Sequence, residues 1–323
     1  MFTIFPASTG NSQQLSFDIA VLNIGSSLSI PLNFPSNIVP TRPINNFFNK
    51  LITIEKSFQE RDSKSLNIVV VGGGTAGVEL AFCAQTRYQK LFPNIPRKVT
   101  IISNRPRLMH QYHISVSRKI EQLMNDRNIK VMLNKTVHVA ENSELCIYSS
   151  QQISEDLKSV AKIDCDICFW STGASPSDLS RNLSAKKDPT NSWLLVDQHF
   201  RSVNCPFLFG AGDCITIEGC EIPKAGVYSV REGPVIAANV LKILQNYELY
   251  VTECSKLRGS STLELQKYFP QSDFLTLVNL GNGTALGTKY GFAFEGVSLY
   301  YLKDWIDRKF IDSFDTKKLV ANS

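Results

Sequence analysis

The chain has 323 residues, of which 43% are hydrophobic and 20% are charged, and its formal net charge is +5. This composition excludes a disordered, collagen-like or coiled-coil protein, and the mild charge argues against a dedicated nucleic-acid binder. At about 100–200 residues per domain, the length predicts two domains. No run approaches about 18 apolar residues, and the eight cysteines are scattered singly, so we expect a cytoplasmic protein with reduced thiols.

Strands and helices alternate along most of the chain. An apolar run over 17–24 predicts a buried strand, and a helical pattern over 43–60 puts one apolar face on Ile44, Phe47, Phe48, Leu51 and Ile52. Further strands are expected over 66–71, 99–102, 129–133 and 163–170, and further helices from 78, over 114–128 and over 226–244. This alternation predicts an α/β fold with a doubly wound parallel sheet.

The pattern changes after about residue 255. Short strands are expected over 274–280, 284–288 and 291–299, followed by a helix from 300, which together indicate a small α+β C-terminal domain. This last helix carries Leu302, Trp305, Ile306, Phe310, Ile311 and Phe314 on one side, with Lys303, Arg308, Lys309, Lys317 and Lys318 around them. We expect it to face the core of its domain. The alternative is peripheral contact with an anionic membrane surface.

The best-marked segment is Gly72-x-Gly74-x-x-Gly77, which follows a predicted strand and begins a predicted helix. In this context the first glycine permits a tight turn, the second lets the backbone approach a pyrophosphate, and the third lets helix and strand pack closely. The N–H groups at the helix start, where Thr75 and Ala76 lie, would then bind the diphosphate of a dinucleotide. The alternative is a glycine-rich turn with a structural role only.

The end of the next strand bears on the choice of nucleotide. An acidic residue there would accept a hydrogen bond from a ribose 2′-hydroxyl, but this chain has Ser103 and, two residues later, Arg105. A serine and an arginine can accommodate a 2′-phosphate, which favours NADPH or a relaxed choice between NADH and NADPH. The alternative is that the arginine is a solvated surface charge.

A second signature lies further along the chain. An apolar strand ends in Gly210-Ala211-Gly212-Asp213, preceded in sequence by Thr172-Gly173-Ala174. A carboxylate at the carboxyl end of a strand lies where α/β folds bind their ligands, and it can hydrogen-bond a polyol chain.

Four segments together carry a family resemblance: GGGTAGVELA, STGASP, FLFGAGDC and IPKAGVYSVREGPVIAAN. Their order resembles that of flavoproteins with two dinucleotide domains, which include pyridine nucleotide-disulfide oxidoreductases and type II NADH:quinone dehydrogenases. The chain also resembles the NADH-dehydrogenase-like flavoprotein module found fused to selenide, water dikinase, on the patterns Pro223–Gly226 and Lys303–Arg308. The resemblance runs from about residue 17 to 314.

The resemblance implies a role for each matching position. Gly72, Gly74 and Gly77 would hold the NAD(P)H pyrophosphate, with Glu79 beside the nicotinamide and Gly173 lining the cleft between nicotinamide and flavin. Asp213, with Gly212 before it, would bind the ribityl chain of FAD. The segment from Lys224 through Ala225 and Arg231 to Glu232 would approach the pyrimidine edge of the flavin. The family more often has glutamine at position 232, so the hydrogen bond that its side-chain amide would donate is in question here.

The resemblance thus implies an FAD-dependent NAD(P)H oxidoreductase that passes a hydride to flavin and electrons on to a quinone or another small acceptor. One departure leaves alternatives open, because nothing before Phe17 resembles the glycine loop that binds the ADP half of FAD in this family. The chain could be a fragment or a truncated gene model without stable FAD. It could also be a non-catalytic nucleotide-binding accessory, linked to selenium metabolism through a selenide, water dikinase partner.

The resemblance also divides the chain. We expect part of an FAD-binding domain over 1–60, an NAD(P)-binding Rossmann domain over 61–172, the rest of the FAD-binding domain over 173–250, and the α+β domain over 251–323.

Two further patterns have plain structural interpretations. Cys165 and Cys168 form a CxxC, but we expect them on one strand with acidic neighbours, where residues three apart point to opposite faces. His110 and His113 have a spacing that metal ligands use, but no cysteine or carboxylate cluster completes a site, so no metal is expected.

Overall fold

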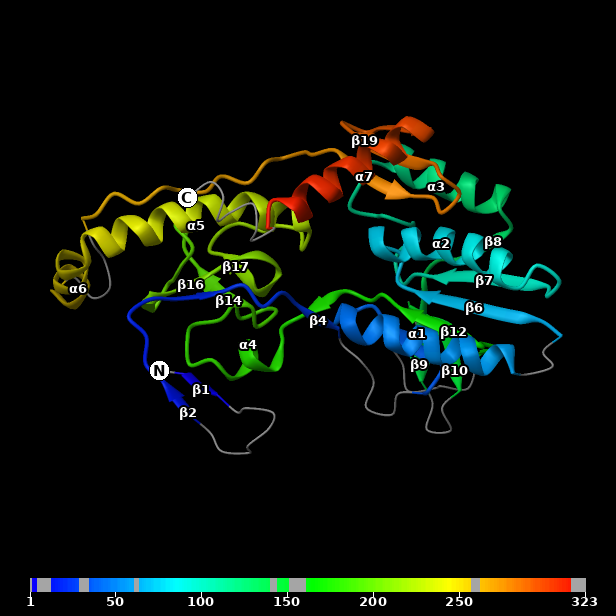
Figure 1. Ribbon diagram of the computed structural model, residues 1–323, viewed down its shortest axis with the longest axis horizontal. Coiled ribbons are helices and arrows are strands. Elements are labelled where there is room, and N and C mark those ends of the chain that lie inside the picture. The colour runs from blue at the N-terminus through cyan, green and yellow to red at the C-terminus, as the bar shows by residue number, and fades with distance from the viewer. Residues whose placement is uncertain are drawn as a thin grey trace. The chain divides into compact units, whose positions relative to one another are not determined.

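The computed structural model describes residues 2–4, 13–28, 35–60, 64–139, 144–150, 161–256 and 262–314 (Figure 1). The chain divides into two compact units. Unit 1 comprises Met1–Ser27 and Ala174–Gln271, and unit 2 comprises Leu28–Gly173 and Ser272–Ser323.

Unit 2 is built on a five-stranded parallel sheet. In spatial order its strands are β5 (Ile38–Pro40), β12 (Ile167–Trp170), β6 (Leu66–Val71), β7 (Arg97–Ile102) and β8 (Ile129–Met132). The strands are continuous apolar runs because both faces of the sheet are covered: Ile68 and Val70 are fully buried in one core cluster, and Val69 lies 1% exposed in another.

Helices cover one face of this sheet, and a small antiparallel sheet covers the other. The helices are α1 (Ile44–Gln59), α2 (Thr75–Leu91) and α3 (Ile114–Asp126), which share the larger core cluster. The strands of the small sheet are β9 (Lys135–Val139), β10 (Leu145–Ser149) and β11 (Ala161–Ile163). Val137 and Ile147 from this small sheet belong to the same core cluster as Trp170 of β12.

The C-terminal segment completes unit 2. It consists of the antiparallel strands β18 (Thr276–Asn279), β19 (Ala285–Lys289) and β20 (Phe292–Gly296), followed by α7 (Val297–Asp312). Val278 and Leu286 are fully buried in the same core as α2. The Arg127 guanidinium lies 5.1 Å from the Phe82 ring centre and donates to the carbonyl of Leu280, which ties this segment to the helices.

Unit 1 holds a mixed five-stranded sheet. In spatial order its strands are β17 (Ile215–Ile217), β14 (Leu194–Val196), β15 (Arg201–Ser202), β16 (Cys205–Gly210) and β3 (Ala20–Leu22). Its helices are α4 (Asp178–Asn182), α5 (Gly226–Gln245) and α6 (Tyr247–Lys256), with the short 3-10 helix η2 (Gly212–Cys214) after β16. Phe200, Phe209 and Tyr250 are fully buried in its core. The remaining strands are β1 (Phe2–Ile4), β2 (Gln13–Leu15), β4 (Ser27–Leu28) and β13 (Ala174–Ser175).

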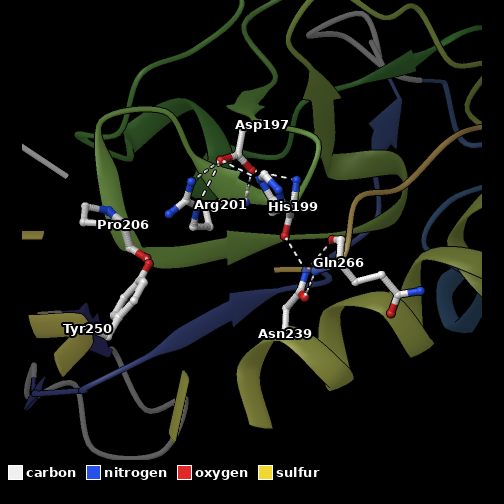
Figure 2. A network of polar contacts seen from close by, with 7 residues as sticks. All are labelled: Asp197, His199, Arg201, Pro206, Asn239, Tyr250 and Gln266. Atoms are coloured by element: carbon white, nitrogen blue, oxygen red, sulfur yellow. Dashed lines mark hydrogen bonds and ion pairs between the residues drawn. The ribbon is translucent and has the colours of Figure 1, made fainter. Parts of the chain in front are cut away.

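A polar network fixes helices α5 and α6 and the segment after them onto this sheet (Figure 2). Asn239 is 1% exposed; its amide nitrogen donates to the carbonyl of Gln266 at 2.9 Å, and its amide oxygen accepts from the Gln266 N–H at 2.7 Å. Tyr250 donates to the carbonyl of Pro206 at 2.7 Å, and Asp197 accepts from Arg201 Nε at 2.9 Å. The polar groups of the buried Asn239 and Tyr250 side chains are therefore hydrogen-bonded.

The expected α/β fold with parallel sheets is confirmed, and two local expectations are wrong. Residues 163–170 do not form one strand, since β11 ends at Ile163 and β12 begins at Ile167. Cys165 therefore precedes β12, and it packs against the same core cluster that contains Cys168, so the two side chains do not lie on opposite faces of one strand. Burial raises the pKa of the Cys168 thiol well above its ordinary value, which disfavours a reactive thiolate.

Two expected helix faces are also partly wrong. On α1 the buried positions include Phe47 and Leu51, but Ile44, Phe48 and Ile52 are exposed. The C-terminal helix begins at Val297 and packs on β18 and β19, with Leu299 against Gly287. None of its residues is fully buried, however, and Trp305, Ile306, Phe310, Ile311 and Phe314 of the predicted core-facing side are exposed. Its basic residues are partly neutralised, because Lys303 pairs with Asp307 and Arg308 with Asp304. Lys317 and Lys318 lie outside the described residues.

In the part of the chain that the structure describes, no helix is long and apolar enough to cross a membrane.

Candidate nucleotide-binding sites

The glycine turn of unit 2 joins β6 to α2, and two of its glycines are required by close backbone contacts. Gly72 has φ +121°, and a Cβ atom there would lie 2.0 Å from the carbonyl oxygen of Ser171. A Cβ atom on Gly77 would lie 1.9 Å from the carbonyl oxygen of Gly72. The first turn of α2 therefore rests directly on the strand-end turn, as the motif predicts.

The middle glycine of this turn lies in open space. A Cβ atom on Gly74 would have no heavy atom within 4 Å. Gly74 is also the N-cap of α2, and no side chain caps this helix end. The first N–H groups of α2, where Thr75 and Ala76 lie, are thus left for an external acceptor, and the helix dipole favours an anion there.

The predicted residues after β7 lie beside the glycine turn. Ser103 is 3% exposed, its hydroxyl accepts from the Arg105 N–H at 3.2 Å, and a Cβ atom on Gly73 would be 2.5 Å from that hydroxyl. The Arg105 side chain is exposed, and none of the ion pairs found among the described residues involves it. Arg107, by contrast, donates to the carbonyl of Tyr112 at 2.7 Å and so stabilises the loop between β7 and α3.

The other two predicted residues of unit 2 have different surroundings. Glu79 lies on α2 with its carboxylate 4.0 Å from Lys303 Nζ of α7, so it contacts the C-terminal helix. Burial raises the pKa of Glu79, against the opposing effect of Lys303. Gly173 follows β12, is exposed, and has no heavy atom within 4 Å of the Cβ position. A role for Gly173 in lining the cleft between nicotinamide and flavin stays a prediction.

The strand-end turn of unit 1 follows β16. Gly212 has φ +70°, and its N–H donates to the Glu232 carboxylate at 2.5 Å. The next residue, Asp213, accepts a hydrogen bond from the Ser26 hydroxyl at 3.1 Å. The side chain of Asp213 therefore lies at the carboxyl end of β16, beside the segment that follows β3.

Lys224 brings a cation to the same end of unit 1. Its ammonium lies 4.7 Å from the Trp193 ring centre and donates to the carbonyl of Ile215. Burial lowers the pKa of Lys224, and Asp213 partly opposes that shift. The following residue, Ala225, is the N-cap of α5, and no side chain caps this helix end. Arg231 is exposed on α5.

The structure thus places the predicted residues in two groups. Unit 2 holds Gly72, Gly74, Thr75, Ala76, Gly77, Glu79, Ser103, Arg105 and Gly173. Unit 1 holds Gly212, Asp213, Lys224, Ala225 and Arg231. Two contacts were missed from the sequence: the hydroxyl of Ser26 on Asp213, and the carboxylate of Glu232 on Gly212. The glycine-serine turn after β3 and the unusual residue at 232 were the available signals.

Comparison with known proteins identifies the family. The pyridine nucleotide-disulphide oxidoreductase family profile matches residues 2–239. The chain is 27% identical over 319 residues to "External NADH-ubiquinone oxidoreductase 2, mitochondrial" of Saccharomyces cerevisiae, covering 90% of this chain and 56% of the yeast protein. It is 22% identical over 247 residues to the type II NADH:quinone oxidoreductase of Haemophilus influenzae, covering 72% and 49% of the two chains. It therefore spans about half the length of these relatives.

A solved structure of NDH2 from Plasmodium falciparum, in complex with NADH, shares the fold. The two superpose with a TM-score of 0.64 at 15% identity, over 93% of this chain and 76% of that one.

Proposed function

The chain belongs to the pyridine nucleotide-disulphide oxidoreductase family, and on that premise we propose that it is an FAD-dependent NAD(P)H oxidoreductase. The observation that carries the proposal is the glycine turn of unit 2. Gly72 and Gly77 leave no room for a side chain, whereas Gly74 lies open at the uncapped start of α2. A turn with a structural role alone would require the close packing at Gly72 and Gly77. It would not require an open glycine at position 74 beside an uncapped helix start.

The residues of unit 2 fit the pyrophosphate of NAD(P)H. The N–H groups at Thr75 and Ala76 would bind its oxygens, with the backbone at Gly74 in close approach. The exposed Arg105 guanidinium would bind a 2′-phosphate when NADPH is the donor, while the buried Ser103 hydroxyl holds the Arg105 backbone in place. Both nucleotides can bind, and Arg105 sets the preference between them.

The residues of unit 1 fit the ribityl and flavin part of FAD. Asp213 would accept hydrogen bonds from the ribityl hydroxyls, and the uncapped start of α5 with Lys224 would stabilise negative charge on the reduced ring. A bound FAD would supply the redox chemistry, namely acceptance of a hydride from the nicotinamide and transfer of two electrons to an acceptor. The side chains themselves bind and orient the two nucleotides, and none of them needs to act as a nucleophile.

The acceptor and partners belong to the same proposal. The yeast and Haemophilus relatives carry ubiquinone or quinone in their names, which supports a quinone or a similar small acceptor here. Peripheral membrane contact through α7 is consistent with its exposed Tyr301, Trp305 and Ile311. A selenide, water dikinase partner rests on the sequence resemblance alone.

The test is the visible absorption spectrum of the purified chain, with and without added FAD, followed by anaerobic addition of NADH or NADPH. A bound flavin band that bleaches is the expected result, and the nucleotide that bleaches it faster is the donor. The matched control is the Gly74→Val variant, which should keep the flavin band but bleach slowly. A folded protein that stays colourless with FAD, yet binds NADH, would instead be a nucleotide-binding accessory.

A further inference from the structure

Glu232 is a buried acidic residue that the proposed chemistry does not use. It lies on α5, is 2% exposed, and places one carboxylate oxygen 2.5 Å from the Gly212 nitrogen. A buried carboxylate needs hydrogen-bond donors or a cation nearby, and here the donor is the backbone of the strand-end turn. The contact therefore joins α5 to the turn that carries Asp213.

That turn is tightly enclosed on two sides. Gly212 adopts φ +70°, and a Cβ atom there would lie 2.9 Å from the Ser229 hydroxyl and 3.0 Å from the Asn23 amide oxygen. Its N–H is thus held by α5, while the neighbouring Asp213 is held by Ser26. Loss of the Glu232 contact would leave the Gly212 N–H buried without its partner and free the turn to rotate.

The groups facing Glu232 come from three elements. Asp213 lies on η2, Lys224 precedes α5, and Tyr268 lies on the segment after α6. Burial raises the pKa of Glu232, the Gly212 N–H and Lys224 lower it, and Asp213 raises it. Burial therefore has the largest effect on the protonation of Glu232, and Lys224 and Asp213, which would hold the cofactor, modulate it.

We propose that Glu232 is a positioning residue for Asp213, and that its protonation makes the geometry of the ribityl-binding turn depend on pH. The inference rests on the proposed function for its relevance to FAD. An ionised carboxylate accepts a charge-assisted bond from Gly212, whereas a protonated one accepts a weaker neutral bond. FAD affinity should then weaken as pH falls through the titration of Glu232. Glutamine at this position accepts the same bond at every pH, so Glu232→Gln should remove the dependence.

The Gly212 amide can be observed directly, because the chain contains only three Ala-Gly pairs, at 76–77, 211–212 and 225–226. Labelling the full chain with carbonyl-13C alanine and 15N glycine selects these three amide resonances in an NMR spectrum. The Gly212 resonance should shift between pH 4 and pH 8 in the wild type and stay constant in Glu232→Gln. The Gly77 resonance of unit 2 is the internal reference in both proteins.

FAD affinity is measured in parallel by quenching of flavin fluorescence over the same pH range. We expect several-fold weaker binding at low pH in the wild type, a flat profile in Glu232→Gln, and about tenfold weaker binding at all pH values in Glu232→Ala. A Gly212 resonance that does not titrate, or that titrates equally in Glu232→Gln, overturns the inference whether or not FAD binds. Titration of Gly212 in a protein that binds no FAD overturns the proposed function instead, and with it the role toward FAD.

Discussion

In each unit of the molecule, a buried strand is followed by a turn that contains glycine, and the two turns are stabilised by different kinds of contact. In unit 2 the turn is held by backbone against backbone, since Gly72 packs on Ser171 and Gly77 packs on Gly72. In unit 1 the turn is held by side chains, namely Glu232 on Gly212 and Ser26 on Asp213. A turn of the first kind depends on the absence of side chains, whereas one of the second kind depends on charged and polar groups far away in the sequence.

The largest effect is expected from adding one methyl group to the turn of unit 2. Gly77→Ala places a carbon 1.9 Å from a backbone oxygen that cannot move without moving β6. We expect the free energy of unfolding of unit 2 to fall by about 2–4 kcal/mol, with loss of NADH binding. Hydrogen exchange of peptides from β6 and α2, read by mass spectrometry, measures the change.

Gly74→Ala is the matched control for that variant. Its new methyl group meets no atom within 4 Å, and Gly74 has an ordinary φ of −78°, so the free energy of unfolding should change by no more than about 0.5 kcal/mol. NADH affinity should nevertheless fall, because the methyl group occupies the space through which the pyrophosphate approaches. Equal destabilisation by the two variants would contradict the distinction between a packed glycine and an open one.

The turn of unit 1 should respond to the loss of a side chain instead. Glu232→Ala leaves the Gly212 N–H without its partner, and we expect unit 1 to lose about 1–3 kcal/mol of stability. The pH dependence has a definite sign. Because the pKa of Glu232 lies above its ordinary 4.5, the folded state binds the proton more tightly than the unfolded state. The ionised carboxylate binds the Gly212 N–H more strongly, but burying its charge costs more than this bond and Lys224 recover. The net contribution of Glu232 to stability is therefore present at low pH and is lost as pH rises through the raised pKa.

Urea unfolding at several pH values between 4 and 8, followed by hydrogen exchange in peptides of α5, separates these effects. In Glu232→Gln, the part of the pH dependence of the unfolding free energy that is due to this residue should vanish. An unchanged pH dependence in Glu232→Gln would mean that another group causes it.

Side-chain support of unit 1 extends to the network in Figure 2, where a smaller effect is expected. Asn239→Ala removes the bonds to the backbone of Gln266, so the segment after α6 should detach at a cost of about 1–2 kcal/mol. The matched control is Asn246→Ala, whose amide donates to the carbonyl of Lys242 near the surface. Faster proteolysis between residues 262 and 271 in the first variant alone would support this role, and equal rates would contradict it.

The contrast between the turns also explains what the sequence could predict. The turn of unit 2 is encoded by the local motif Gly72–Gly77, so its glycines, the strand before it and the helix after it were all predicted, although the contact of Gly72 with Ser171 was not. The turn of unit 1 is completed by Ser26 and Glu232, from segments that precede and follow it by many residues, and no local pattern connects them. The burial of Ile44, Phe48 and Ile52 on α1 was wrongly predicted for a related reason. Periodicity predicts an apolar face but not which of its residues pack against the rest of the protein.

The smallest effect is expected at Arg105, which lies beside the turn of unit 2 and takes no part in its packing. Arg105→Ala removes an exposed guanidinium, so stability should not change, but NADPH affinity should fall by about fivefold while NADH affinity stays the same. Arg118→Ala, another exposed arginine in unit 2, controls for the loss of one positive charge. Isothermal titration with both nucleotides, at low and high salt, measures the difference. Equal losses for NADH and NADPH would place Arg105 at the pyrophosphate and not at the 2′-position, because only the 2′-phosphate distinguishes the two nucleotides.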